Sequence, residues 1–470
     1  MISDRLSPIL VKELRQGLRS RVFEGSFLLL QVMMVFVLVI ALLAKSQRES
    51  EVAEVFGQAI FWLIVGFPLM LIMPMRGCNA LRSEMDARSL ELIFLTHLSA
   101  WRIVVGKWAA LFCQTCLFVC AVLPYAVLRY YLGSIEIQQD LIVLGWLLLA
   151  SAIFTALTVC TSAFNSKIAR GMIFLFPLLL IFGPLGIGTF ATLYSFFYGH
   201  SSSVSPTFGP GSGMLYFGLG SLFYGGLTIA YLLEIGAERI SPISENHACR
   251  KRVIGILVLL SGPVAVWMGA DTDILIVNFL LLVAICMDAT ACAWVPVPGL
   301  LRPLRWMKRL LKPGAAFSLP GWPSGVLYSV AMMTGSLMII FLFDSVNNDV
   351  LAFHISALGT VLFPVAVILA ARPRMRRFGT AYYVIQLATV ILMMCWIVID
   401  QLFDLRMIEV LSVLPQATLF LQLMEEADSS WMIVNLSVLV AVLLAIIVRG
   451  IPFWIEMKRM ALQTPREAPV

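Results

Sequence analysis

Residues 27–44 read FLLLQVMMVFVLVIALLA, an apolar run in which Gln31 is the single polar side chain. At about 1.5 Å per residue, such a helix is roughly 27 Å long, close to the thickness of a bilayer's hydrocarbon core. The run starts late and ends in Ala44-Lys45-Ser46, without the small-residue cleavage pattern of a signal peptide. The stretch therefore predicts a transmembrane helix that stays in the mature chain.

The composition of the whole chain extends this prediction. Of the 470 residues, 60% are hydrophobic and 13% are charged. Soluble domains are about 45–50% apolar and about 25% charged. The composition excludes a soluble globular enzyme and a disordered chain, and it predicts an all-α polytopic membrane protein.

Twelve apolar runs are long enough to cross a membrane, which predicts about twelve transmembrane helices in two six-helix halves. They are 27–44, 56–75, 108–128, 141–164, 171–198, 214–235, 253–270, 274–297, 326–343, 351–371, 381–403 and 431–448.

The basic residues between these runs predict the orientation of the chain. With the N-terminus in the cytoplasm, 29 of the 33 Lys and Arg fall in the inside segments. Such an excess is the positive-inside signal of membrane proteins. It predicts that both termini are cytoplasmic. Because the basic residues are spread over seven segments, the net charge of +6 does not indicate nucleic-acid binding.

The chain is predicted to begin with an amphipathic helix on the membrane surface, within residues 1–26. Ser7 suits a helix N-cap and Pro8 the first helical position. Apolar and basic residues then alternate at helical spacing, as in helices of the headgroup layer. The residues that define this helix are Lys12, Glu13, Leu14, Arg15 and Arg19.

The inside loop 76–107 is longer and more apolar than a passive connection needs. Its block 90–95 is too short to span a membrane and too apolar to be solvated. A short helix with an apolar centre and a polar rim is typical of a protein interface. Ser99 suits the N-cap of the helix that follows.

The pattern Glu84…Leu90-Glu91-Leu92-Ile93-Phe94-Leu95-Thr96-x-Leu98-Ser99…Ile103-Val104-x-Gly106-Lys107 resembles the coupling loop in the membrane subunit of ABC-2 type transporters. Val11-Lys12-Glu13-Leu14-Arg15 is similar to that family's surface helix. The sequence departs from the family pattern at 86–89, where a Gly-Thr pair is usual, and at His97, where Pro is common.

The resemblance implies a six-span permease domain over 27–240, coupled through 76–107 to a separate ABC ATPase subunit. Residues 241–470 match no motif, and we interpret them as a second six-span bundle, either a diverged second half or an accessory. The coupling residues that the resemblance implies are Glu84, Leu90, Glu91, Leu92, Leu95, Thr96, Leu98, Ser99, Gly106 and Lys107. The family implies export across a bacterial inner membrane, with ATP on the partner and a homodimer or second permease as a further partner.

Motifs for chemistry on the chain itself are absent from the sequence. It holds no G-x-x-x-x-G-K-[ST], no H-E-x-x-H and no G-x-S-x-G, and its four His are scattered. We therefore expect a transport subunit with no catalytic site, no metal and no cofactor of its own.

Asp288 is the one carboxylate predicted near the middle of a span, where it would be a possible intramembrane polar site. We find no second carboxylate or basic residue at similar depth, which favours a role in helix packing over a proton or cation site. A twelve-span secondary, ion-coupled transporter remains the alternative function. A polytopic membrane enzyme is a third possibility, which the short outside loops disfavour.

Overall fold

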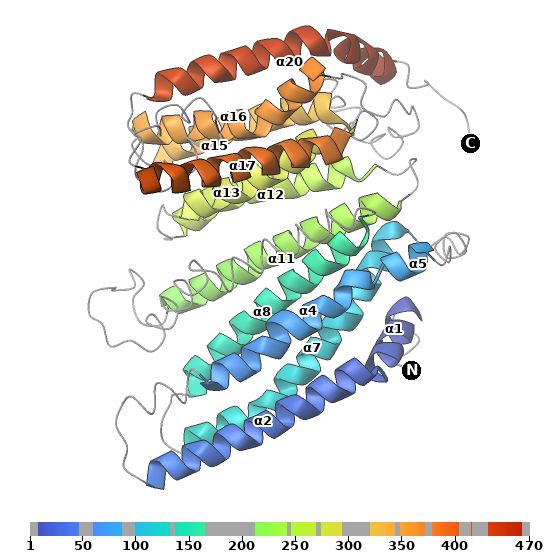
Figure 1. The fold of residues 1–470 in the computed structure, drawn as a ribbon, viewed down its shortest axis with the longest axis vertical. Coiled ribbons are helices and arrows are strands. Elements are labelled where there is room, and N and C mark those ends of the chain that lie inside the picture. The colour runs from blue at the N-terminus through green and yellow to red at the C-terminus, as the bar shows by residue number, and fades with distance from the viewer. Residues whose placement is uncertain are drawn as a thin grey trace. The chain divides into compact units, whose positions relative to one another are not determined.

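The fold is seen in a computed structural model of the chain. It describes residues 8–46, 60–86, 99–131, 137–164, 212–241, 246–268, 274–293, 320–343, 348–371, 378–403, 415 and 431–462. Within these ranges all regular structure is helical and no strand occurs (Figure 1).

The chain divides into two compact units, Met1–Ser241 (unit 1) and Pro242–Val470 (unit 2). Each unit is a bundle of long apolar helices. The described helices of unit 1 are α1 (Pro8–Leu18), α2 (Arg21–Ser46), a broken helix over Ile60–Met85, α7 (Ala100–Tyr131), α8 (Ile137–Ser162) and α11 (Ser212–Ile240). Those of unit 2 are α12 (Ala248–Trp267), α13 (Ile274–Ala291), α15 (Trp322–Phe343), α16 (Asn348–Ala371), α17 (Phe378–Phe403) and α20 (Trp431–Leu462).

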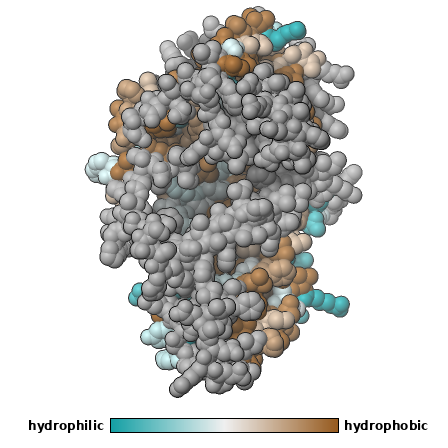
Figure 2. All heavy atoms as spheres, turned by 60° about the vertical axis from the view of Figure 1, so that its left-hand side comes forward, coloured by the Kyte–Doolittle hydropathy of each residue, from teal (hydrophilic) through white to brown (hydrophobic). Residues whose placement is uncertain are grey.

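Eight of the described helices are long and apolar enough to cross a membrane, and two shorter apolar helices lie at Asn278–Ala291 and Phe378–Leu392. Many large apolar side chains are exposed on them, including Leu28 at 65% and Phe341 at 72%. Figure 2 shows this character on one face, where hydrophobic side chains of the described residues gather at the surface. Such surfaces require lipid rather than water. The chain is therefore an integral, polytopic membrane protein.

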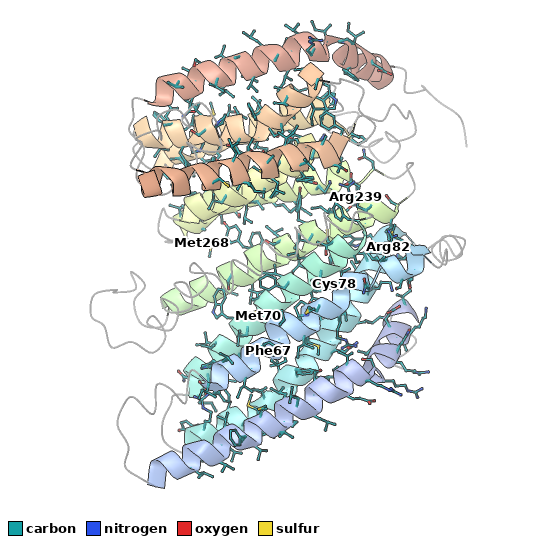
Figure 3. All side chains as sticks on the ribbon, viewed as in Figure 1. Phe67, Met70, Cys78, Arg82, Arg239 and Met268 are labelled. Atoms are coloured by element: carbon teal, nitrogen blue, oxygen red, sulfur yellow. The ribbon has the colours of Figure 1, made fainter. Side chains whose placement is uncertain are left out.

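Eleven of the twelve predicted spans overlap a described helix. The predicted span 171–198 lies outside the described residues. Figure 3 places Arg82, in α5 (Arg82–Asp86), and Arg239, near the end of α11, at the same end of unit 1.

The broken helix over Ile60–Met85 in unit 1 is not a regular α-helix. A π-helical turn, η1 (Pro68–Ile72), is followed by α4 (Met73–Met75), a 3₁₀ turn, η2 (Arg76–Asn79), and α5. Pro74 lacks the N–H that would continue an α-helical ladder, which explains why the helix is irregular here. The Ser151 hydroxyl of α8 donates a 2.6 Å hydrogen bond to the carbonyl of Leu69 within the π turn. A neighbouring helix thus satisfies a backbone group of the break.

The two units share a packing pattern. In unit 1, α8 contacts η1, α4 and η2 of the broken helix, and it also contacts α11. In unit 2, α16 contacts α13 and α20. In each unit the fourth of the predicted spans therefore packs between the second and the last.

Candidate coupling site

The site is centred on Lys107, a buried cation two turns into α7. Its side chain is 5% exposed, and its Nζ lies 2.9 Å from Oε1 of Glu84 and 3.1 Å from Oε1 of Glu13. We call these three residues the Lys107 cluster. Glu84 belongs to α5, at the start of the predicted loop, and Glu13 belongs to α1. One ammonium group therefore joins the surface helix, the start of the loop and the helix that follows the loop.

Helix α1 packs along α7 through one of its faces. Ile9 contacts α7 at Gly106, where an added Cβ would lie 3.1 Å from Cγ2 of Ile9. Two turns further on, Gly17 lies against the side chain of Gln114. Ile9, Glu13 and Gly17 are spaced by four residues and so lie on one helical face. The small residues let α1 approach closely enough for the ion pair to form.

Arg76, the first residue of η2, forms a second connection between the loop and α1. Its guanidinium donates 3.0 Å hydrogen bonds to the carbonyl of Gly17 and to Oγ of Ser20, and it also donates to Oε1 of Gln114. It lies over the ring of Phe23, 5.6 Å from the centroid. The junction between α1 and α2 is thus attached to the residue at which the predicted coupling loop begins.

Helix α8 holds the same segment from the other side. Oγ of Ser162 accepts a 3.1 Å hydrogen bond from the backbone N–H of Leu81, a fully buried residue just before α5. Gly77 faces Thr158, and an added Cβ there would overlap the threonine side chain. The segment from the π turn to α5 is therefore held by α8 hydroxyls and by Arg76.

The three charged residues of the Lys107 cluster differ in their exposure to solvent. Removing a buried ammonium from its partners is costly, since an unpaired charge in a low-dielectric site loses several kcal/mol of solvation. The carboxylates are less enclosed, with Glu13 24% and Glu84 15% exposed. Glu13 is the more accessible of the two acids, so water reaches its carboxylate more readily than that of Glu84.

The predicted coupling residues fall into three groups. Glu84, Gly106 and Lys107 lie in or beside the cluster. Ser99 directly precedes α7, and its carbonyl accepts a hydrogen bond from the N–H of Ile103. Leu90, Glu91, Leu92, Leu95, Thr96 and Leu98 lie outside the described residues.

The predicted surface-helix residues divide by face. Glu13 faces Lys107, Leu14 is half-buried, and Lys12, Arg15 and Arg19 are exposed. Two apolar residues of α1, Ile9 and Leu18, pack against buried clusters of unit 1. The sequence analysis did not single out Arg76 or Gln114. A basic residue next to a predicted span is interpreted as an orientation signal, and a single Gln in an apolar helix belongs to no recognisable motif.

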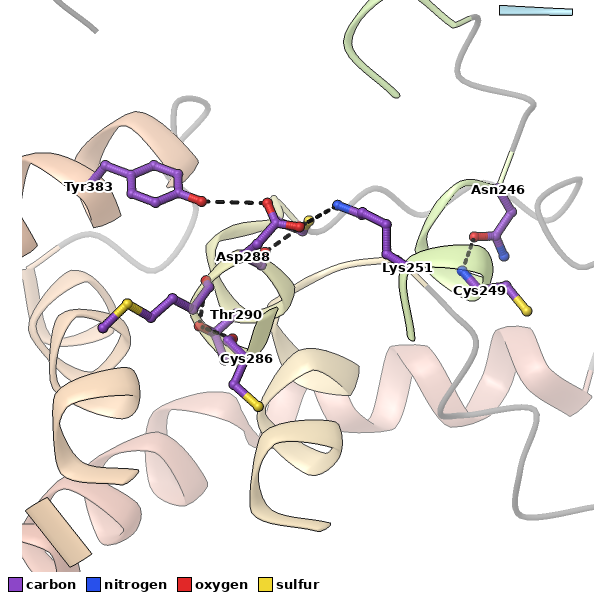
Figure 4. Close-up of polar contacts among 9 residues, drawn as sticks. Asn246, Cys249, Lys251, Cys286, Asp288, Thr290 and Tyr383 are labelled. Atoms are coloured by element: carbon purple, nitrogen blue, oxygen red, sulfur yellow. Dashed lines mark hydrogen bonds and ion pairs between the residues drawn. The ribbon is translucent and has the colours of Figure 1, made fainter. Parts of the chain in front are cut away.

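The possible polar site at Asp288 differs from its prediction. Asp288 lies three residues before the end of α13 and does have a basic partner: Nζ of Lys251, in the first turn of α12, is 2.6 Å from its Oδ2 (Figure 4). The hydroxyl of Tyr383 in α17 donates a 3.4 Å hydrogen bond to Oδ1. Lys251 is 4% and Asp288 8% exposed. The expectation of no partner was wrong because Lys251 precedes the predicted span and was counted as part of an inside loop.

The neighbourhood of this ion pair is closely packed. An added Cβ on Gly325, in the first turn of α15, would overlap the backbone carbonyl of Ala289. Beside it, Arg252 donates a 2.9 Å hydrogen bond to Oγ of Ser324. Four helices therefore meet around the end of α13, joined by a buried ion pair and by direct contact between backbones.

Among the described residues, no group of three or more His, Cys, Asp or Glu could hold a metal ion. Comparison with protein-family models, curated proteins and solved structures finds no match to this chain.

Proposed function

We propose that the chain is the membrane subunit of an ATP-driven ABC-2 type exporter, coupled through loop 76–107 to a separate ATPase subunit. ATP binding and hydrolysis on that partner would displace the loop, and the loop would bias the bundle between inward- and outward-facing states. In this proposal the chain has about twelve spans with both termini in the cytoplasm, and it resides in a bacterial inner membrane.

The observation that carries the proposal is the Lys107 cluster. A loop that only connects two helices has no need of a buried cation that holds both of its ends and a third helix. Any force on the apolar block between Glu84 and Ser99 acts at once on α5, α1 and α7. Arg76 extends the connection to the junction of α1 and α2. The arrangement therefore fits a loop that transmits movement.

The broken helix over Ile60–Met85 supports the same proposal. π-helical turns occur often at functional sites, and a short π turn followed by a 3₁₀ turn changes its hydrogen bonds more easily than a regular helix. This break covers the end of the predicted span 56–75 and the start of the predicted loop 76–107. Movement of the loop can therefore reach the membrane through the break without unfolding a complete helix.

The first test is whether an ATPase co-purifies with the chain. The tagged full-length chain is extracted from its host in mild detergent, alongside a variant with Leu92→Asp and Leu95→Asp in the apolar block. We expect an ABC ATPase with the unchanged chain and none with the variant, because the carboxylates would be buried in the interface. No ATPase with either chain, or equal recovery with both, would contradict the proposal.

A second variant separates docking from transmission. Lys107→Gln keeps the apolar block unchanged but removes the cation that joins the three elements. We expect the ATPase to co-purify in normal amounts with this variant, while its hydrolysis rate no longer responds to the presence of the membrane subunit. Leu63→Ala, which changes a 69% exposed lipid-facing side chain, is the matched control and should leave that response intact.

A secondary transporter is the alternative, and the buried Asp288 site is the observation in its favour. A carboxylate bonded to both a lysine and a tyrosine could exchange a proton when the pair opens. Asp288→Asn would then abolish proton-dependent transport in vesicles, measured on the protein that remains monodisperse in gel filtration. Transport that needs ATP and survives this substitution would exclude the alternative.

A further inference from the structure

Helix α1 has a second face, away from the one that packs on α7. Lys12, Arg15, Gln16 and Arg19 are all exposed. Lys12 and Arg15 are three residues apart and lie on one side of the helix, and Arg19 directly follows its last residue, Leu18. We call Lys12, Arg15 and Arg19 the basic stripe. It carries three positive charges over roughly 10 Å, at about 1.5 Å per residue.

The position of α2 shows what surrounds the basic stripe. Helix α2 begins at Arg21, two residues after Arg19, and its side chains Val22 and Leu28 are 59% and 65% exposed. Exposed apolar side chains at the start of a transmembrane helix face lipid. Arg19 therefore lies three residues before Val22 and eight before Phe27, where the predicted span begins, which places the stripe beside the headgroup layer.

We infer that the basic stripe of α1 is a binding surface for the headgroups of anionic phospholipids. The charge is complementary, since juxtamembrane Lys and Arg are attracted to acidic lipids. The stripe is also fixed in position, because another face of α1 packs against α7 through Ile9, Glu13 and Gly17. A lipid bound to the stripe thus contacts the helix that contributes Glu13 to the Lys107 cluster.

An acidic protein surface is the competing occupant, and the closeness of the stripe to the lipid-facing start of α2 favours lipid. The inference does not depend on the proposed function, because lipid binding can be measured on the chain alone.

The experiment places the photoreactive residue p-benzoylphenylalanine at Gln16, an exposed position between Arg15 and Arg19 in the sequence. The full-length chain is reconstituted in nanodiscs of phosphatidylglycerol and phosphatidylcholine in equal amounts, irradiated, and analysed for lipid adducts by mass spectrometry. The same residue at Val35, a 51% exposed position within α2, serves as the control for lipid away from the stripe.

We expect phosphatidylglycerol to exceed phosphatidylcholine among the Gln16 adducts by about threefold or more, and to equal it among the Val35 adducts. The triple variant Lys12→Gln, Arg15→Gln, Arg19→Gln should abolish the preference. Arg250→Gln, an exposed basic residue at the start of α12, should leave it unchanged. High salt should also weaken it, since the contact is exposed.

Three results would overturn the inference. Equal yields of the two lipids at Gln16 would show no selectivity. A preference that persists in the triple variant would assign it to other residues. An absence of lipid adducts at Gln16, with capture of an added ATPase subunit there instead, would assign the stripe to a protein contact.

Discussion

The two units of this protein each place a buried lysine beside a carboxylate, but they enclose it differently. Lys107 in unit 1 is held by two acids that are 24% and 15% exposed, on a surface helix and a short helix next to a loop. Lys251 in unit 2 is held by Asp288, 8% exposed, between the ends of long helices. The contrast indicates that unit 1 has an ion-pair cluster that can rearrange, whereas unit 2 has one that fastens helices together.

The largest effect should come from breaking the pair in unit 2. Lys251→Met leaves Asp288 buried without its cation, and we expect the free energy of unfolding to fall by about 3–5 kcal/mol. Thermal unfolding in detergent, followed by gel filtration of the remaining monodisperse protein, measures the change. The double variant Lys251→Met, Asp288→Leu should recover most of the loss, since no charge is then buried alone. A double variant no more stable than the single one would refute the assignment of Asp288 as the charge left behind.

The backbone contact in unit 2 should give the next largest effect. Gly325→Ala forces a Cβ into the carbonyl of Ala289, and backbone cannot yield as a side chain does, so we expect a loss of about 1–3 kcal/mol or more. Gly335→Ala on the same helix is the control. Its Cβ would meet the end of the Leu259 side chain at 3.3 Å, and this variant should retain its stability. Equal losses in the two variants would contradict the close contact as the cause, because Ala favours a helix over Gly at both positions.

Removing the cation in unit 1 should be less costly. We expect Lys107→Met to lower the free energy of unfolding by about 1–2 kcal/mol, because Glu13, which is 24% exposed, can turn toward water. The same thermal assay compares it directly with Lys251→Met. If the two substitutions cost the same, the contrast between a changeable and a fastened ion pair is wrong.

The smallest effect should come from the broken helix of unit 1. Ser151→Ala removes the hydroxyl that bonds the Leu69 carbonyl, and a lost hydrogen bond of this kind costs about 1 kcal/mol. Amide hydrogen exchange over 68–75 should rise while that of α8 stays constant. Ser437→Ala is the control, since this exposed hydroxyl of α20 bonds only within its own helix. Unchanged exchange over 68–75 would show that Ser151 does not stabilise the π turn.

Sequence alone determined the class of the protein. Apolar runs such as 27–44 predict helices directly, because a bilayer forces each spanning segment to satisfy its own backbone hydrogen bonds. The break in the helix over Ile60–Met85 was not predicted, although Pro68 and Pro74 lie in it, because the run 56–75 is almost entirely apolar. Composition alone also distinguishes the loop at 76–107, because its apolar block at 90–95 is unusual for a connection between two spans.

The tertiary structure alone decided which residues meet. Lys107 and Glu13 are 94 positions apart, and Lys251 and Asp288 are 37 apart, so no local pattern joins them. Between apolar helices, side-chain burial is similar on many faces, and the register is set by small residues such as Gly17, Gly106 and Gly325 that permit close approach. Helix formation in a membrane follows from local hydrophobicity, whereas ion pairing follows from packing, and packing depends on the whole bundle.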